Sequence, residues 1–163
     1  MTFPFNFIII PGVIIATAVV GNRYVKRGFA QDDWYKHLKK PTWTPSGRLI
    51  GEIWTFLYVL TGLAILWYWD VPVFTWFHYV VAAILLVNAY LNATWNKIFF
   101  VEHDLPKALK TMKILNGTTI LVALLISIPA PISCFLLLPY IAWVGIATRL
   151  TSEIITLNTD TKN

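Results

Sequence analysis

Charged residues are scarce in this sequence. Lys, Arg, Asp and Glu make up 13% of its 163 residues, and 57% of the residues are hydrophobic. An ordinary soluble domain has roughly 25% charged residues. A soluble chain of this composition could not keep so much apolar surface away from water. The composition therefore predicts an integral membrane protein.

The sequence also lacks the groups on which most metal sites and many enzymes depend. A single cysteine, Cys134, excludes a disulfide scaffold. The three histidines, His37, His78 and His103, lie far apart, so their spacing predicts neither a metal site nor an axial haem ligand. No Ser/His/Asp constellation, phosphate-binding loop or nucleic-acid motif is present. We expect no metal, no required cofactor and no nucleic-acid partner.

Five apolar runs are each long enough to cross a bilayer as a helix. A helix of ~22 residues rises roughly 33 Å, and the hydrocarbon core is about 30 Å thick. Strands are excluded, because an exposed sheet edge is not tolerated in lipid. The predicted spans, all in one domain over 1–163, are about 5–25, 46–69, 73–100, 107–128 and 132–157, with a loop over 26–45. The predicted fold is an all-α bundle of five transmembrane helices.

All 13 Lys and Arg residues fall on one side of this arrangement. They lie around the connection between the first two spans, around that between the third and fourth, and after the fifth: Arg23, Lys26, Arg27, Lys36, Lys39, Lys40, Arg48, Lys97, Lys107, Lys110, Lys113, Arg149 and Lys162. The positive-inside rule makes this side cytoplasmic. The N-terminus is therefore predicted outside and the C-terminus in the cytoplasm.

Polar and aromatic residues recur at helical spacing within three of the predicted spans. They are Trp54 and Tyr58 in the second, Asn88, Asn92 and Trp95 in the third, and Trp143 and Ala147 in the fifth. If these faces converge, they line a cavity suited to a flat, largely apolar ligand with polar edges. Packing without a ligand explains the same periodicity equally well. For Asn88, an interhelical hydrogen bond is the preferred interpretation.

One acidic residue, Glu52, lies inside a predicted span. It is a candidate for proton coupling, but an interfacial ion pair with Arg48 or Arg149 is the preferred interpretation. Gly12 and Ala16 follow the pattern of small residues four apart, which predicts close helix contacts within the bundle or in a homodimer.

Three segments resemble the motifs of a known family. They are WYKHLKKPTWTPSGRLIGEIWTFLY over 34–58, NAYLNATWNKIFF over 88–100 and LLLPYIAWVGIAT over 136–148. In this order they resemble the first-loop and second-helix, third-helix and fifth-helix motifs of the TspO/MBR family of tryptophan-rich membrane proteins, once called peripheral-type benzodiazepine receptors. The resemblance runs over about 8–158 and implies five helices.

The resemblance also implies a function. It implies that the protein binds porphyrins such as protoporphyrin IX and acts in tetrapyrrole transport, sensing or a stress response. Some members of the family also bind sterols and isoquinoline or benzodiazepine-type ligands. By position, the seven residues of the three stripes match the pocket-lining places of the family. A loop that covers the pocket is matched by Trp34, Pro41, Trp43 and Pro45.

Two alternatives stay open at this point. Some bacterial members promote light- and oxygen-dependent breakdown of protoporphyrin, which would make Trp54 and Trp143 catalytic and porphyrin a substrate. The second alternative is a membrane scaffold. In it the tryptophans only pack, and a partner protein recognises the basic loop. The implied location is the bacterial cell membrane, or the mitochondrial outer membrane in a eukaryote.

Overall fold

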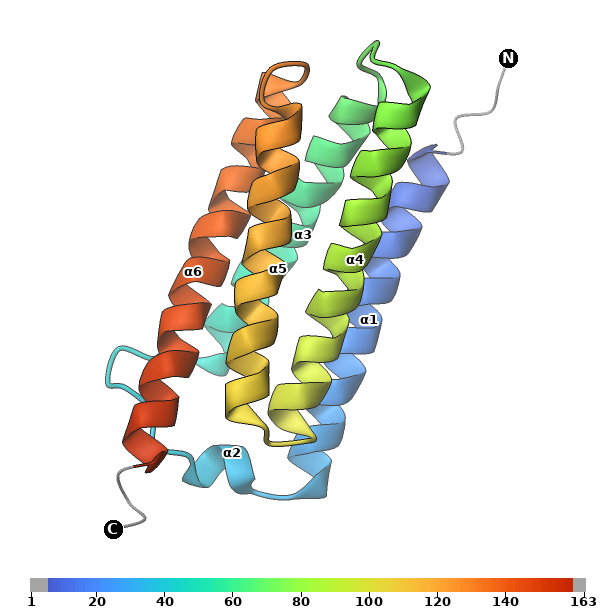
Figure 1. The fold of residues 1–163 in the computed structure, drawn as a ribbon. Helices are drawn as coiled ribbons and strands as arrows, with labels where there is room; N and C mark the ends of the chain where they lie inside the picture. Colours follow the sequence, from blue (N-terminus) through green and yellow to red (C-terminus); the bar gives the residue numbers. More distant parts are fainter. Residues whose placement is uncertain (1–5, 160–163) are drawn as a thin grey trace.

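Five long helices and one short helix make up the protein (Figure 1). The computed structural model describes residues 6–159 as α1 (Asn6–Gln31), α2 (Trp34–His37), α3 (Gly47–Trp69), α4 (Thr75–Phe100), α5 (Leu105–Ile126) and α6 (Pro131–Thr159). These described residues contain no β-strand. Since all five long helices are apolar enough to cross a membrane, the predicted all-α bundle of five spans is confirmed. Phe5, where the first span was predicted to begin, and Lys162 lie outside the described residues.

Local sequence signals set the start of two of the helices. Ser46 caps α3, because its hydroxyl oxygen accepts a hydrogen bond from the backbone N–H of Leu49 at 3.2 Å. Asp104 caps α5 in the same way, and its carboxylate accepts from the N–H of Lys107 at 2.9 Å. Such caps satisfy donors that the first turn of a helix leaves free. Both caps lie at the end of the bundle that carries α2, which we call the α2 end (Figure 1).

The long helices form a closed ring. Each packs mainly against two neighbours, in the order α1, α4, α5, α6, α3 and back to α1. The contact between α1 and α3 is the least extensive of the five. Helices α3 and α4 follow one another in the chain but lie on either side of α1 in the ring. Because the ring is closed, side chains from α1, α3, α4 and α6 can meet in its interior.

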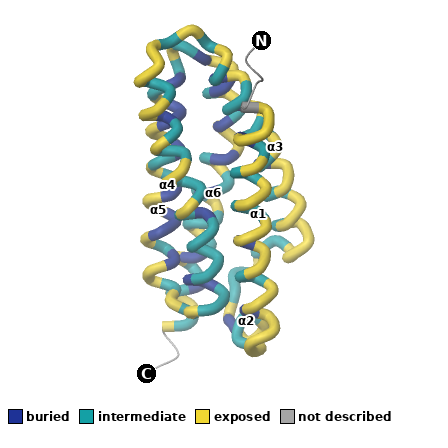
Figure 2. The backbone as a smooth tube through the Cα atoms, turned by 90° about the vertical axis from the view of Figure 1, so that its right-hand side faces the viewer, coloured by how far each residue is buried: buried dark blue, intermediate teal, exposed yellow. Residues whose placement is uncertain are grey.

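Buried apolar side chains form three clusters along the length of the bundle. One centres on Tyr68 and Leu137, a second on Leu57 and Tyr140, and the third, at the α2 end, on Phe99. The outer faces of the helices are exposed over most of their length (Figure 2). Many of the exposed side chains are large and apolar, such as Leu124 and Phe135. Apolar residues outside as well as inside are what a bilayer requires.

The loop between the first two spans is shorter than the sequence predicted. A loop was predicted over 26–45, but α1 continues to Gln31 and α2 takes up Trp34–His37. Near its end, α1 lies directly on α4 at Gly28. A Cβ atom at this position would lie 2.3 Å from the carbonyl oxygen of Phe100. This packing stabilises helical turns that the basic residues of the sequence had suggested to be loop.

Candidate functional site

A cavity of about 710 Å³ lies inside the bundle, toward the α2 end. Side chains from α1, α3, α4 and α6 line most of it, and the segment before α3 contributes Pro45. The walls are mostly apolar and aromatic. Cavities that hold small molecules typically measure roughly 300–1,000 Å³ and have such walls with a few polar groups. The size and lining of this cavity are therefore those of a small-molecule site.

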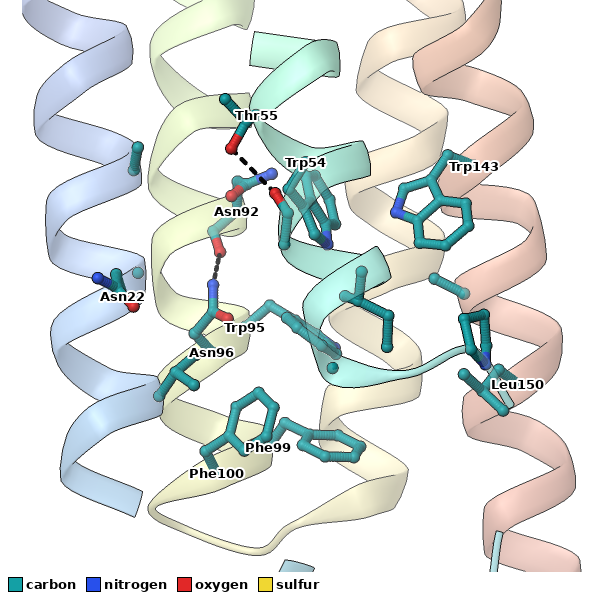
Figure 3. Close-up of a pocket in the computed structure, with 18 of the residues that line it drawn as sticks. Asn22, Trp54, Thr55, Asn92, Trp95, Asn96, Phe99, Phe100, Trp143 and Leu150 are labelled. Atoms are coloured by element: carbon teal, nitrogen blue, oxygen red, sulfur yellow. Dashed lines mark hydrogen bonds between the residues drawn. The ribbon is translucent and has the colours of Figure 1, made fainter. Parts of the chain in front are cut away.

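Two tryptophans from neighbouring helices face this cavity. Figure 3 shows the indole of Trp54 on α3 and the indole of Trp143 on α6, both directed into the space between the helices. Trp54 packs edge-on against Tyr140, with 5.9 Å between ring centroids and an interplanar angle of 80°. These contacts hold the indole in one orientation. Indoles from α3 and α6 thus form part of the cavity wall, which suits a planar ligand.

Two indole N–H groups on the cavity wall have no hydrogen-bond partner. The Nε1 atoms of Trp95 and Trp143 are inaccessible to solvent, and neither has a hydrogen-bond partner among residues 6–159. Both residues line the cavity. A buried donor left unpaired costs about 1–3 kcal/mol, and such groups are rare in folded proteins. Water reaches neither nitrogen, so a ligand acceptor would reach these donors only if the indoles turned toward the cavity.

Asn92 closes the cavity on the side away from the α2 end. Its Oδ1 accepts from the hydroxyl of Tyr58 at 2.7 Å, and its Nδ2 donates to the hydroxyl oxygen of Tyr140 at 2.7 Å. The chain of two hydrogen bonds ties α4 to both α3 and α6. Tyr58 and Asn92 also line a second cavity, of about 180 Å³, that lies on the other side. They therefore form the wall that the two cavities share.

Asn88 does not lie on the large cavity. Its Nδ2 is directed to α5, where it lies 2.8 Å from the hydroxyl oxygens of Thr118 and Thr119 and 3.1 Å from the carbonyl oxygen of Leu115. Asn88 lines only the second cavity. Position 88 is one helical turn further from the α2 end than position 92, and there α4 meets α5. The amide therefore holds two helices together instead of facing the large cavity.

The remaining stripe residues come together as the sequence suggested. Trp54, Tyr58, Asn92, Trp95, Trp143 and Ala147 all line the large cavity. Sequence reasoning missed the whole contribution of α1, which supplies Ala18, Asn22 and Val25. The polar Asn22 within an apolar run, four residues after Ala18, is the signal that could have found this face.

The loop that the sequence predicted to cover the pocket lies between α1 and α3 in the structure, over residues 32–46, and we call it the lid loop. Aromatic packing holds its start. The ring of Trp34 stacks on His103, with 4.1 Å between centroids and 14° between planes, and meets Phe99 edge-on at 5.8 Å. The backbone N–H of Trp34 donates to the carboxylate of Asp32 at 3.0 Å. Trp34 thus fixes α2 to the turn between α4 and α5 and does not line the cavity.

The second half of the lid loop is held by α6. The indole N–H of Trp43 donates to Glu153 Oε2 at 2.8 Å, and the guanidinium of Arg149 lies 5.7 Å from the Trp43 ring centroid. Pro41 supplies a carbonyl oxygen that accepts from the N–H of Thr44 at 3.0 Å in a turn. Of the four lid residues that the sequence singled out, Pro45 alone lines the cavity. The other three keep the lid in place.

Three charged residues of the lid loop, Asp33, Lys36 and Lys40, have close partners. The hydrogen bond that Asp33 accepts from Lys36, at 2.6 Å, lowers the pKa of Asp33. The ammonium of Lys40 donates to the carbonyl oxygen of Tyr35 and lies 4.1 Å from the centroid of the Tyr35 ring. Burial there lowers the pKa of Lys40 and raises that of Tyr35. Among residues 6–159, no three His, Cys, Asp or Glu side chains are placed to share a metal ion.

Comparison with known proteins gives one consistent answer. Residues 7–157 match the TspO/MBR family. The chain is 33% identical over 129 residues to the tryptophan-rich protein TspO of Bacillus cereus, an alignment that covers 77% of this chain and 80% of the relative. It is 32% identical over 131 residues to the uncharacterized membrane protein YtaB of Bacillus subtilis, covering 77% and 81%. It is 29% identical over 132 residues to the translocator protein of Homo sapiens, covering 80% and 77%. The chain is a membrane protein that belongs to the TspO/MBR family.

Proposed function

We propose that this protein binds a porphyrin, with protoporphyrin IX as the reference ligand, in the large cavity lined by Trp54 and Trp143, for tetrapyrrole transport, sensing or a stress response. The cavity of about 710 Å³, with the indoles of Trp54 and Trp143 in its mostly apolar wall, is the observation that carries the proposal. A porphyrin has a flat aromatic body that can stack on indole rings, and carboxylates that accept hydrogen bonds. No resident cofactor is needed for binding.

The test is a titration of purified protein with protoporphyrin IX, followed by the absorbance of the porphyrin. Trp143→Phe keeps a flat ring but replaces the indole with a smaller one, so we expect the Kd to rise about two- to tenfold from lost ring contact. Trp143→Ala also removes the wall, and its Kd should rise further. Trp67→Phe is the matched control, because Trp67 is 56% exposed on the outside of α3.

The outcome that would contradict the proposal is specific. Equal Kd values for wild type, Trp143→Ala and Trp67→Phe would place the bound porphyrin elsewhere. Haem provides a second arm of the same titration. Among residues 6–159, neither a histidine nor a cysteine lines the cavity, so free-base porphyrin and haem should bind with similar affinity.

A second candidate function is light-driven breakdown of the bound porphyrin, with molecular oxygen as the oxidant. It is favoured by the two indoles that face one cavity, since both would lie beside an excited macrocycle. Illumination of the protein–protoporphyrin complex in air would test it. Loss of porphyrin absorbance faster in wild type than in a Trp54→Phe, Trp143→Phe double variant supports an enzyme. Equal bleaching in both leaves binding alone.

The same cavity could take flat isoquinoline or benzodiazepine-type compounds, which we propose as competing ligands. Displacement of protoporphyrin by such a compound is the measurement. A homodimer is a further proposal. Gly12 leaves open space on the surface of α1, where a Cβ atom would meet nothing within 4 Å. If another copy packs there, Gly12→Leu should shift the protein from dimer to monomer in size-exclusion chromatography with light scattering.

A scaffold without a ligand remains the competing explanation for the tryptophans. It predicts that protoporphyrin leaves the thermal stability of the protein unchanged. Porphyrin binding predicts a rise in melting temperature that grows with ligand concentration, because a ligand that binds the folded state stabilises it by mass action.

A further inference from the structure

The charged groups on the large cavity are confined to its mouth. Among the described residues that line it, Arg48 and Glu52 are the only ones of the Lys, Arg, Asp and Glu types. Both belong to the first two turns of α3, and both side chains are largely exposed. The deeper lining is apolar, aromatic or neutral. A carboxylate placed deep in this cavity would lose its hydration without gaining a charged partner.

The Arg48 guanidinium keeps one edge free. Its Nε donates to Oε1 of Glu52 at 2.8 Å, and its two terminal amino groups have no partner among residues 6–159. The end of a guanidinium presents two parallel N–H donors, a geometry that matches the two oxygens of a carboxylate. Glu52 thus orients Arg48 while the carboxylate-binding edge stays open.

A second pair with the same spacing shows what Arg48 lacks. Arg149 Nε donates to Glu153 Oε1 at 2.8 Å, again four residues apart on one helix. That pair holds the lid loop, because Glu153 also accepts a hydrogen bond from the indole N–H of Trp43 and the guanidinium of Arg149 lies over the Trp43 ring. Neither residue of that pair lines the cavity. Arg48 and Glu52 have no comparable structural task.

We propose that Arg48 recognises the carboxylate edge of the ligand and so sets both its orientation and its class: a flat apolar molecule with carboxylates on one side. This inference rests on the proposed porphyrin site. The ligand lies with its carboxylate edge at the mouth beside Arg48 and its apolar edge toward the wall formed by Asn92 and Tyr58. Glu52 is a positioning residue for Arg48.

The experiment compares protoporphyrin IX with its neutral dimethyl ester in phosphatidylcholine nanodiscs. Wild type should bind the diacid about three- to tenfold more tightly than the diester, a range that allows for solvent screening of a pair at an open mouth. Arg48→Gln should remove this preference by weakening diacid binding alone. Diester binding then also reports that the variant is folded. Arg27→Gln, which removes a charge from α1 outside the cavity, should leave both affinities unchanged.

Other outcomes separate this inference from the proposed function. If wild type binds neither compound, the porphyrin site itself is wrong. If both bind and Arg48→Gln weakens both or neither, the site stands and the role of Arg48 is overturned. Phosphatidylglycerol nanodiscs distinguish a lipid phosphate from a ligand carboxylate on Arg48. A diacid preference that persists there supports the ligand, and one that disappears overturns the proposal in favour of a lipid headgroup.

Discussion

The close approach of α1 to α4 makes Gly28 the position at which a single methyl group should do most damage. In Gly28→Ala, the new Cβ would lie 2.3 Å from the carbonyl oxygen and 2.8 Å from the carbonyl carbon of Phe100. These are backbone atoms, so no side chain can turn aside. Ordinary contact begins near 3.4 Å, and α1 must therefore move by about 1 Å, which costs ~1–3 kcal/mol in a packed interior.

Gly117→Ala on α5 is the matched control, because a Cβ atom at Gly117 meets nothing within 4 Å. Both substitutions improve helix propensity by about 0.5–1 kcal/mol. Thermal unfolding in detergent should therefore leave Gly117→Ala at or above wild type. Gly28→Ala should melt about 3–10 °C lower, from the usual relation between stability and melting temperature.

The Gly28→Ala variant should also bind protoporphyrin more weakly, because α1 forms one wall of the large cavity. A melting temperature for Gly28→Ala equal to that of Gly117→Ala would refute the reasoning. It would mean that α1 and α4 lie farther apart at Gly28 than the structure places them. Unchanged porphyrin affinity combined with a lower melting temperature would instead show that the wall formed by α1 is dispensable.

Three further predictions follow from other contacts. Asn88→Ala should lower the free energy of unfolding by about 1 kcal/mol, the usual size of an interhelical hydrogen bond in membranes, and leave the Kd for protoporphyrin unchanged, whereas a raised Kd would make Asn88 a ligand contact. The hydrogen bond from Lys107 is the main reason that the pKa of Glu102 lies below its usual 4.5. The folded state therefore binds this proton less readily than the unfolded state. The resulting stabilisation is present above about pH 4.5 and is lost as the pH falls through the folded pKa. Acid unfolding curves of Glu102→Gln should lack this component, and curves that match wild type would contradict it. With Cys134→Ser as background, Asp70→Cys should react with a membrane-impermeant maleimide added to intact cells, because the end opposite α2 is predicted to lie outside; labelling only after lysis would reverse the topology.

The five spans could be predicted because each depends only on its own composition. A run of about 20 apolar residues must cross the bilayer whatever its neighbours do. The ends were harder to place, since α1 continues past its basic residues to Gln31 through packing on α4. That contact joins residues 28 and 100, and the sequence around either position does not predict that the two helices meet there.

The site was predictable where the residue type itself was unusual. Trp54 and Trp143 lie deep in their helices, at positions where an interfacial tryptophan does not belong, and both line the cavity. Asn88 and Asn92 could not be distinguished in this way, because they share one face of α4. Only the ring order places α5 beside Asn88, whereas Asn92 meets Tyr58 and Tyr140.

The amide of Asn92 has a consequence for both cavities. The two hollows of the bundle lie in series along α1, and one carboxamide with its two phenol partners separates them. A substitution that removed this partition would join the proposed ligand site to the second cavity. The same side chain thus shapes the proposed ligand site and separates it from the hollow beyond.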